Sequence, residues 1–171
     1  MTRPDIENVP AFYKTYVEYV MDMDVMDALR HSSKLVQQLV PYIPEDKGKY
    51  RYAEGKWTVK EVINHMMDAE RVFAYRALRF SRNDSTALSP FDEDAYAPEA
   101  NAHHRTVQQL AKEMKRLRDT TIDLYASFSP EMLQREGTAS GKKLSVLNLG
   151  YIIAGHDIHH HKILHDRYLN S

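Results

Sequence analysis

The chain has 171 residues, of which 43% are hydrophobic and 27% are charged, a composition typical of a globular protein and not of a disordered one. Its 23 lysines and arginines are balanced by 24 aspartates and glutamates, and a formal net charge of -1 argues against nucleic acid as the main partner. Cysteine is absent, which excludes disulfides, thiolate metal sites and cysteine nucleophiles, so any metal ion must be held by nitrogen or oxygen atoms.

This length predicts a single domain over residues 1–171. The first residues include Arg3, Asp5 and Glu7 and lack the apolar centre of a secretory signal. No stretch approaches the roughly 20 apolar residues that cross a bilayer. We therefore expect a cytoplasmic protein that does not associate with a membrane.

Most of the chain shows apolar residues at the helical period, and the 6 glycines and 7 prolines cluster between these stretches. A short N-terminal helix is predicted over about residues 11–20, within an extension of about residues 8–22. A first long helix is predicted over about residues 24–40, where Pro41 and Pro44 end it.

The second long helix has the clearest start, because Thr58 and Glu61 form the T-x-x-E pattern of a capping box. We expect this helix to continue to about Arg82. A third helix is predicted over about residues 106–128, opened by a T-x-x-Q box, and a fourth over about residues 145–168, after a glycine-containing turn. No strand is indicated, so the sequence predicts an all-α fold, a four-helix bundle.

The connection between the second and third long helices is unusually long. It has about 23 residues, 83–105, whereas simple connections in bundles have about 2 to 8. Pro90 and Pro98 lie within it. Such a segment either crosses the bundle from end to end or covers a site.

Histidine is the one unusual residue type, since five of the nine histidines lie within residues 156–165. On a helical wheel His156 lies at the centre of the apolar stripe, and His160 lies about 40° away within the same stripe. Residues four apart have Cβ atoms about 5–6 Å apart, so these two imidazoles can bind one metal ion. His159 lies at the edge of the stripe, and the remaining two histidines of the segment face away from it.

A third ligand is available on the second helix, where His65 borders the apolar stripe. It can join the pair if the second and fourth helices are neighbours. Asp68 and Glu61 lie three residues after and four residues before His65, so either carboxylate could orient its imidazole. The simpler alternatives are three hydrogen-bonded core or rim histidines and two solvated carboxylates. The other histidines are expected on the surface or in loops: His31, His103 and His104.

Two motifs resemble the DinB-like (DinB/YfiT) superfamily of metalloenzymes. The pattern W-T-x-x-E-x-x-x-H runs from Trp57 to His65, and H-x-x-x-H follows later at His156 and His160. The order and separation of these motifs match the family, and further similarity extends over most of the chain. The family's three metal-binding histidines would fall on His65, His156 and His160, the residues that the helical wheel also selects.

The resemblance implies an up-down-down-up bundle with the long crossover between helices two and three, a divalent metal at one end and a homodimer. Family members include thiol-dependent transferases that use bacillithiol or mycothiol, and maleylpyruvate isomerases. We therefore expect a metal-dependent hydrolase or thiol-dependent transferase that acts on a small-molecule substrate, with a low-molecular-weight thiol as a candidate co-substrate. Zinc or nickel is the expected metal, and iron and manganese also accept imidazole ligands.

A non-catalytic alternative remains open, namely a stress-response bundle that binds a partner or dimerises and has a vestigial metal site. Tyr13, Tyr16 and Tyr19 could line a partner surface or a substrate pocket, or simply pack in the core. The metal hypothesis itself predicts a pH dependence. Because imidazole must be neutral to bind a metal, occupancy should decline as the pH falls through about 6 to 5.

Overall fold

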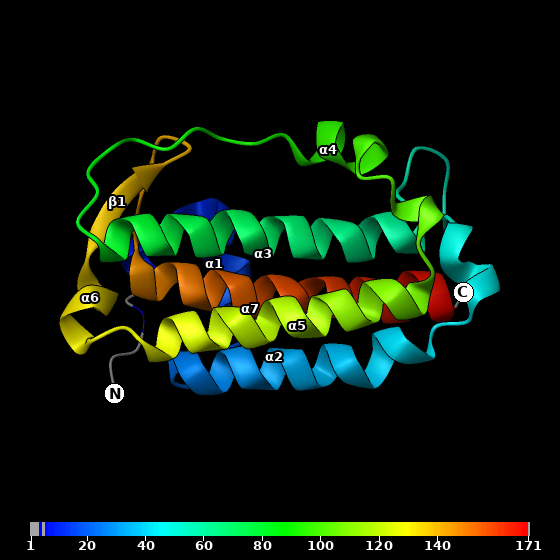
Figure 1. Cartoon of the computed structure of the whole chain (residues 1–171), viewed down its shortest axis with the longest axis horizontal. Coiled ribbons are helices and arrows are strands. Elements are labelled where there is room, and N and C mark those ends of the chain that lie inside the picture. The colour runs from blue at the N-terminus through cyan, green and yellow to red at the C-terminus, as the bar shows by residue number, and fades with distance from the viewer. Residues whose placement is uncertain (1–3, 5, 171) are drawn as a thin grey trace.

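The computed structural model describes residue 4 and residues 6–170, and four long helices lie side by side in it (Figure 1). These helices are α2 (Val25–Leu39), α3 (Val59–Ser81), α5 (Val107–Ala126) and α7 (Val146–Ile163). Helices α2 and α7 run in one direction and α3 and α5 in the other (Figure 1). The predicted all-α, up-down-down-up four-helix bundle is therefore confirmed.

Local capping explains where the long helices begin. Thr58 and Glu61 form a complete capping box at the start of α3, and Thr106 and Gln109 do the same for α5. At the start of α2, the carboxylate of Asp24 accepts a hydrogen bond from a backbone N–H of the first turn. Each side chain binds a backbone donor that would otherwise have no partner within the helix.

Helix α7 is enclosed by its neighbours. It packs against α2, α3 and the short helix α1 (Ala11–Glu18), while α5 packs against α2 and α3. Every residue from 146 to 158 is buried, so this helix is apolar on nearly all sides and not along one stripe only. Gly155 permits the close approach of α1, because a Cβ atom there would lie 1.8 Å from the carbonyl oxygen of Tyr16.

A β-hairpin precedes α7, so the expectation that the chain has no strands was wrong. Strands β1 (Glu136–Ala139) and β2 (Lys142–Ser145) pair antiparallel, with Ala139 opposite Lys142. The two residues between them, Ser140 and Gly141, have φ angles of 52° and 68°. Positive φ at both positions gives a tight turn whose twist matches that of paired strands, which allows strands this short to form.

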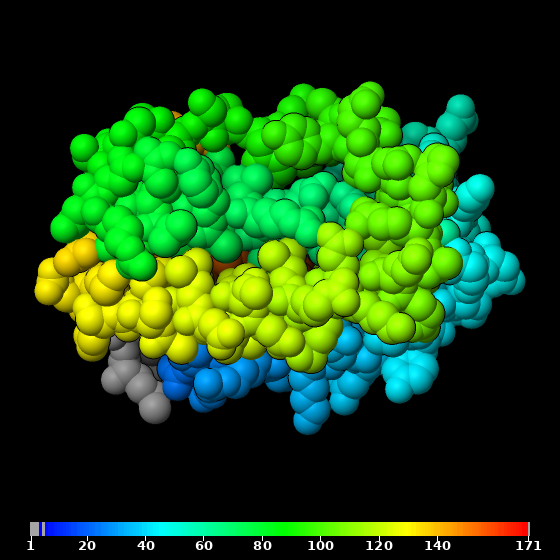
Figure 2. All heavy atoms as spheres, viewed as in Figure 1, coloured from blue at the N-terminus to red at the C-terminus, as the bar shows by residue number. Residues whose placement is uncertain are grey.

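The long crossover runs from the end of α3 to the start of α5 and lies along α3 (Figures 1 and 2). It contains α4 (Glu93–Glu99), which the sequence did not predict. Leu88 fixes it to the hairpin by two backbone hydrogen bonds, one to the carbonyl of Thr138 and one from the N–H of Ser140. The segment therefore crosses the bundle from end to end and also covers part of it.

The remaining elements are short and connect the bundle helices. They comprise one α-helix, one π-helical turn that continues α7, and four 3₁₀ turns: α6 (Pro130–Gln134), Leu164–Leu169, Ile6–Asn8, Val40–Tyr42, Glu45–Lys49 and Ala102–His104. Among the helices that the structure describes, none combines the length and apolarity needed to cross a membrane.

Candidate metal centre

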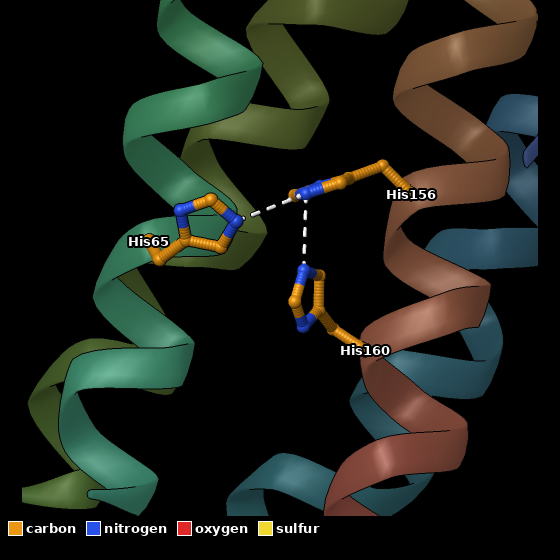
Figure 3. Close-up of side chains that lie close together, drawn as sticks. All are labelled: His65, His156 and His160. Carbon is orange, nitrogen blue, oxygen red and sulfur yellow. Dashed lines mark hydrogen bonds between the residues drawn. The ribbon is translucent and has the colours of Figure 1, made fainter. Parts of the chain in front are cut away.

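Three histidine side chains from two helices point toward a common position (Figure 3). His65 comes from α3, and His156 and His160 come from successive turns of α7. The Nε2 atom of His156 lies 3.1 Å from Nε2 of His65 and 3.1 Å from Nε2 of His160. The structure thus brings together the three histidines that the sequence singled out.

The spacing of these nitrogens fits a metal ion. Nitrogen ligands at 2.0–2.1 Å from one ion lie about 2.8–3.4 Å from each other, the shorter separations in octahedral and the longer in tetrahedral geometry. The observed 3.1 Å separations fall within that range. Within the described part of the chain, these three form the one group of histidine, aspartate or glutamate side chains whose ligand atoms converge, all within 4.8 Å of one another.

Burial keeps the three imidazoles neutral. It lowers the pKa of His65 to about 4, with a smaller contribution from the charge of His159. Burial also lowers the pKa of His156 and His160 well below the usual value, and the neighbouring histidines add to the effect. At neutral pH all three rings are therefore unprotonated and able to bind a metal, and neutral ligands would leave the full charge of a divalent ion uncompensated.

Aromatic rings surround the cluster. The ring of Trp57 lies 4.6 Å from that of His65, between centroids, and the ring of Tyr16 lies 5.4 Å from that of His156. Trp57 is held in place by its carbonyl, which accepts a hydrogen bond of 2.7 Å from the hydroxyl of Tyr168. The imidazoles thus lie in an environment of low polarity, which accounts for their lowered pKa values.

The outer nitrogen of His160 departs from the usual pattern. Its Nδ1 atom is buried and has no hydrogen-bond partner among the residues that the structure describes. A metal-bound histidine normally donates this second N–H to a carboxylate, carbonyl or water. The Nε2 atoms of the three histidines therefore match a metal site, whereas Nδ1 of His160 lacks the hydrogen-bond partner that is usual in such a site.

Glu61, one of the two carboxylates expected to orient His65, has other partners. It accepts a hydrogen bond of 2.7 Å from the N–H of Thr58 in the capping box. It also lies 3.3 Å from Nε2 of His103 and 3.6 Å from the guanidinium of Arg51. No hydrogen bond joins Glu61 to His65 in the described contacts. Its carboxylate instead caps α3 and lies near the side chains of Arg51 and His103.

Asp68, the second of these carboxylates, also points elsewhere. One of its oxygens accepts a hydrogen bond of 2.6 Å from the amide of Asn64, and the other lies 3.2 Å from Arg71. No bond to His65 is present in the described structure. The remaining histidines lie outside the cluster: His31, His103, His104, His159, His161 and His165.

A buried ionic network beside the cluster was not anticipated. The guanidinium of Arg118 on α5 lies 2.8 Å from Glu70 on α3 and 2.7 Å from Asp157 on α7, the residue after His156. Burial raises the pKa of Asp157 against the opposing charge of Arg118. Burial disfavours the charged form of Arg118, but its two carboxylate partners outweigh this and raise its pKa. The one feature of the sequence that points to this network is Asp157, a charged residue within the largely apolar helix α7.

Two cavities include histidines of the cluster in their linings. The first, of about 370 Å³, includes His65 and His156 in its lining, and the second, of about 340 Å³, includes His160 and Trp57. Glu93 lines the first and Asp94 lines the second, so the start of α4 contributes to both linings. Besides the two histidines, the lining of the first cavity includes five aromatic side chains and three charged ones: Phe12, Tyr13, Tyr16, Phe73, Phe91, Arg76, Glu93 and Lys142.

Comparisons with known proteins agree with this geometry. The family model of the DinB superfamily matches residues 28–164. A protein of Geobacillus thermodenitrificans named "Putative metal-dependent hydrolase" is 26% identical over 137 residues, which are 78% of this chain and 76% of that protein.

A solved structure also matches, that of YfiT from Bacillus subtilis, described as "a probable metal-dependent hydrolase with an unusual four-helix bundle topology". It superimposes with a TM-score of 0.72 at 17% identity and covers 81% of this chain and 80% of the matched one. At this identity the likeness establishes the shared fold. Helix α1, which forms part of the first cavity, lies before the residues that the family model matches.

Proposed function

The chain belongs to the DinB superfamily, and from this membership and the three converging imidazoles we propose that it is a metal-dependent hydrolase of a small-molecule substrate. One observation carries the proposal, the two Nε2 to Nε2 separations of 3.1 Å. The relative from Geobacillus thermodenitrificans also supports the proposal, because its name specifies the same class of activity.

The roles of the residues follow from their positions. His65, His156 and His160 would hold a divalent ion through their Nε2 atoms. A divalent ion held there would supply a Lewis acid able to activate water near neutral pH. The first cavity borders two of the three histidines and would hold the substrate beside them. The rings of Tyr16 and Phe73 lie 5.4 and 6.4 Å from that of His156, between centroids, and would limit the access of bulk water to a bound ion.

The donor set favours zinc or nickel and also accepts iron(II) or manganese, because imidazole binds all four and availability decides between them. Thiol transfer, with a low-molecular-weight thiol in place of water, and a homodimeric assembly stay predictions. The non-catalytic alternative, in which the site is vestigial, makes a different prediction. It requires metal binding without turnover of any substrate.

Metal analysis tests the site. We expect purified protein reconstituted with zinc, then freed of loosely bound metal, to retain about one ion per chain. His65→Ala, His156→Ala and His160→Ala should each lose most of it. His161→Ala is the matched control, because His161 is on the same helix but outside the cluster. Equal retention by all five proteins would contradict the proposal.

An activity screen tests the chemistry. The zinc and nickel forms would be assayed with aryl esters, anilides and phosphate esters, and separately with a thiol and an electrophile. Hydrolysis that is lost in His156→Ala and kept in His161→Ala supports the proposed function. Turnover confined to the thiol assay would replace hydrolysis by transfer, and stoichiometric metal with no turnover in either assay would favour the non-catalytic alternative.

A further inference from the structure

Arg76 is a buried cation in the wall of the first cavity. It lies on α3, is 2% exposed, and lines the same cavity as His65 and His156. One of its terminal nitrogens donates hydrogen bonds of 3.0 Å to the carbonyl of Ser89 and 2.9 Å to the hydroxyl of Ser140. The hydroxyl of Tyr13 is a further hydrogen-bond partner. All of these partners are neutral.

The charge of Arg76 has no counterion within the described structure. None of the ion pairs there involves Arg76, although Arg118, which is equally buried, has two carboxylate partners. The rings of Phe73 and Phe91, 5.7 and 5.9 Å from the guanidinium carbon, give weaker electrostatic stabilisation. Removing a charge from water without a counterion is costly, so an anion in the cavity would stabilise this arrangement.

The other groups in the cavity indicate what accompanies that anion. Five phenylalanine and tyrosine side chains line the cavity, and three of them, Phe12, Tyr13 and Tyr16, come from α1. Lys142 adds a second positive charge where the hairpin meets the cavity, and it is exposed. Glu93 is the opposing charge, and it acts on the tyrosines, raising the pKa of Tyr16 in addition to the effect of burial.

We propose that the first cavity binds a ligand with an apolar, preferably aromatic, body and an anionic carboxylate or phosphate group that pairs with the guanidinium of Arg76. The identification of this ligand as the substrate rests on the proposed function. The anion site itself does not, because Arg76 is not among the metal ligands. The histidines occupy another part of the same cavity lining, so the rest of the ligand lies toward them.

The test compares matched probes with protein from which metal has been removed, so that a probe cannot bind through an ion. 2-Naphthoate and 2-naphthamide have nearly the same shape and differ in charge, and 2-naphthyl phosphate distinguishes phosphate from carboxylate. Dissociation constants would be obtained by NMR chemical-shift titration. We expect naphthoate or naphthyl phosphate to bind at least about tenfold more tightly than naphthamide, as hydrogen bonds to charged groups imply.

The variants then assign that preference to Arg76. Arg76→Gln should bring the ratio of the dissociation constants close to one, and Arg76→Lys should retain part of the preference. Arg82→Gln, which removes an exposed arginine from the end of the same helix, should leave the ratio unchanged. Ser140→Ala removes a hydrogen-bond partner of Arg76 without removing the charge, and it should also preserve the preference.

Two results would overturn the proposal: equal binding of naphthoate, naphthyl phosphate and naphthamide by the wild-type protein, or a full preference retained in Arg76→Gln. The first needs no variant, so the proposal stays testable even if Arg76→Gln does not fold. The outcome is separate from that of the metal centre. Retained zinc without anion preference refutes only the anion site, whereas anion preference without retained zinc refutes the metal centre and leaves the anion site intact.

Discussion

Arg76 and Arg118 are equally buried, each 2% exposed, but their surroundings differ. Arg118 binds two carboxylates, Glu70 and Asp157, and donates in addition to the carbonyl of Leu29 and the hydroxyl of Ser32. Among the residues that the structure describes, Arg76 binds only neutral groups. The difference shows that burial alone does not reveal the role of a charged residue, and that the charge of its partners is the better guide.

The two arginines also belong to different parts of the architecture. The partners of Arg118 come from α2, α3 and α7, so the network joins all four long helices. Arg76 instead faces α1, the crossover and the hairpin, which surround the bundle. The bundle thus pairs its own buried arginine with carboxylates, whereas the added elements leave the charge of Arg76 to be paired by a ligand.

The sharpest test of this comparison is the loss of each charge in turn. Arg118→Met leaves two buried carboxylates without a counterion and should lower the free energy of unfolding by about 3–5 kcal/mol. Arg76→Met removes an unpaired cation together with neutral hydrogen bonds, and should cost only about 1 kcal/mol. Urea denaturation followed by circular dichroism measures both.

A combined variant serves as the control for Arg118. Adding Glu70→Gln and Asp157→Asn to Arg118→Met removes the uncompensated charges and should recover part of the lost stability. Equal costs for Arg118→Met and Arg76→Met would show that the two sites do not differ in the way described.

The second test detaches the elements that surround the bundle. Gly155→Ala places a Cβ atom 1.8 Å from the backbone of α1, so we expect displacement of α1 and a loss of about 1–3 kcal/mol in the free energy of unfolding. Urea denaturation gives the stability, and limited proteolysis reports cleavage within α1. Gly48→Ala is the control, because the atoms nearest to its added Cβ all belong to the flexible side chain of Lys60. A Gly155→Ala protein with an uncut α1 and unchanged stability would contradict the close packing described here.

The third test concerns the neutral histidines. The pKa of His65 is lowered to about 4, whereas in the unfolded chain it is about 6.5, so between these values the unfolded state binds a proton that the folded state does not. Stability from this residue is thus fully present above pH 6.5 and is lost as the pH falls toward 4. The effect is about 1.4 kcal/mol per pH unit for one proton.

The measurement compares the metal-free wild type with His65→Ala by urea denaturation from pH 7 to pH 4. The slope of unfolding free energy against pH should be smaller in His65→Ala. The raised pKa of Asp157 acts in the opposite direction, but it is present in both proteins and does not affect the difference. Identical slopes would mean that His65 titrates normally and is not enclosed as described.

The smallest expected effect is that of Glu93, whose negative charge lies in the cavity with Arg76. Because Glu93→Gln removes repulsion between partly solvated groups, it should tighten naphthoate binding by about two- to threefold. Naphthamide serves as the internal control and should bind unchanged in the same NMR titration. Weaker naphthoate binding in this variant would place the anion away from Arg76 and Glu93.

Features set by residues close in sequence were predictable. The starts of α3 and α5 follow from capping boxes that span four residues each, and the pairing of His156 with His160 follows from their spacing on one helix. His65 could be included because it borders the apolar stripe of the second long helix, on the condition that the second and fourth helices are neighbours. The positive φ of Ser140 and Gly141, which makes the hairpin possible, was not recognised from the sequence.

Features that depend on which helices meet were not predictable in the same way. The partners of Arg118 are 39 to 89 residues away in the chain, and those of Arg76 depend on the course of the crossover. For the same reason the sequence offers Glu61 and Asp68 as candidates to orient His65, whereas in the structure the N–H of Thr58 and the amide of Asn64 bind them. Sequence spacing shows which groups can meet, and it does not show which alternative partner is closer.

The central claim is that His65, His156 and His160 bind one divalent ion, and anomalous diffraction from crystals of the zinc-loaded protein tests it most directly. We predict one strong peak at the zinc absorption edge, about 2.0–2.1 Å from the Nε2 atom of each histidine. Zinc located elsewhere, with the three rings left as they are, would contradict the claim.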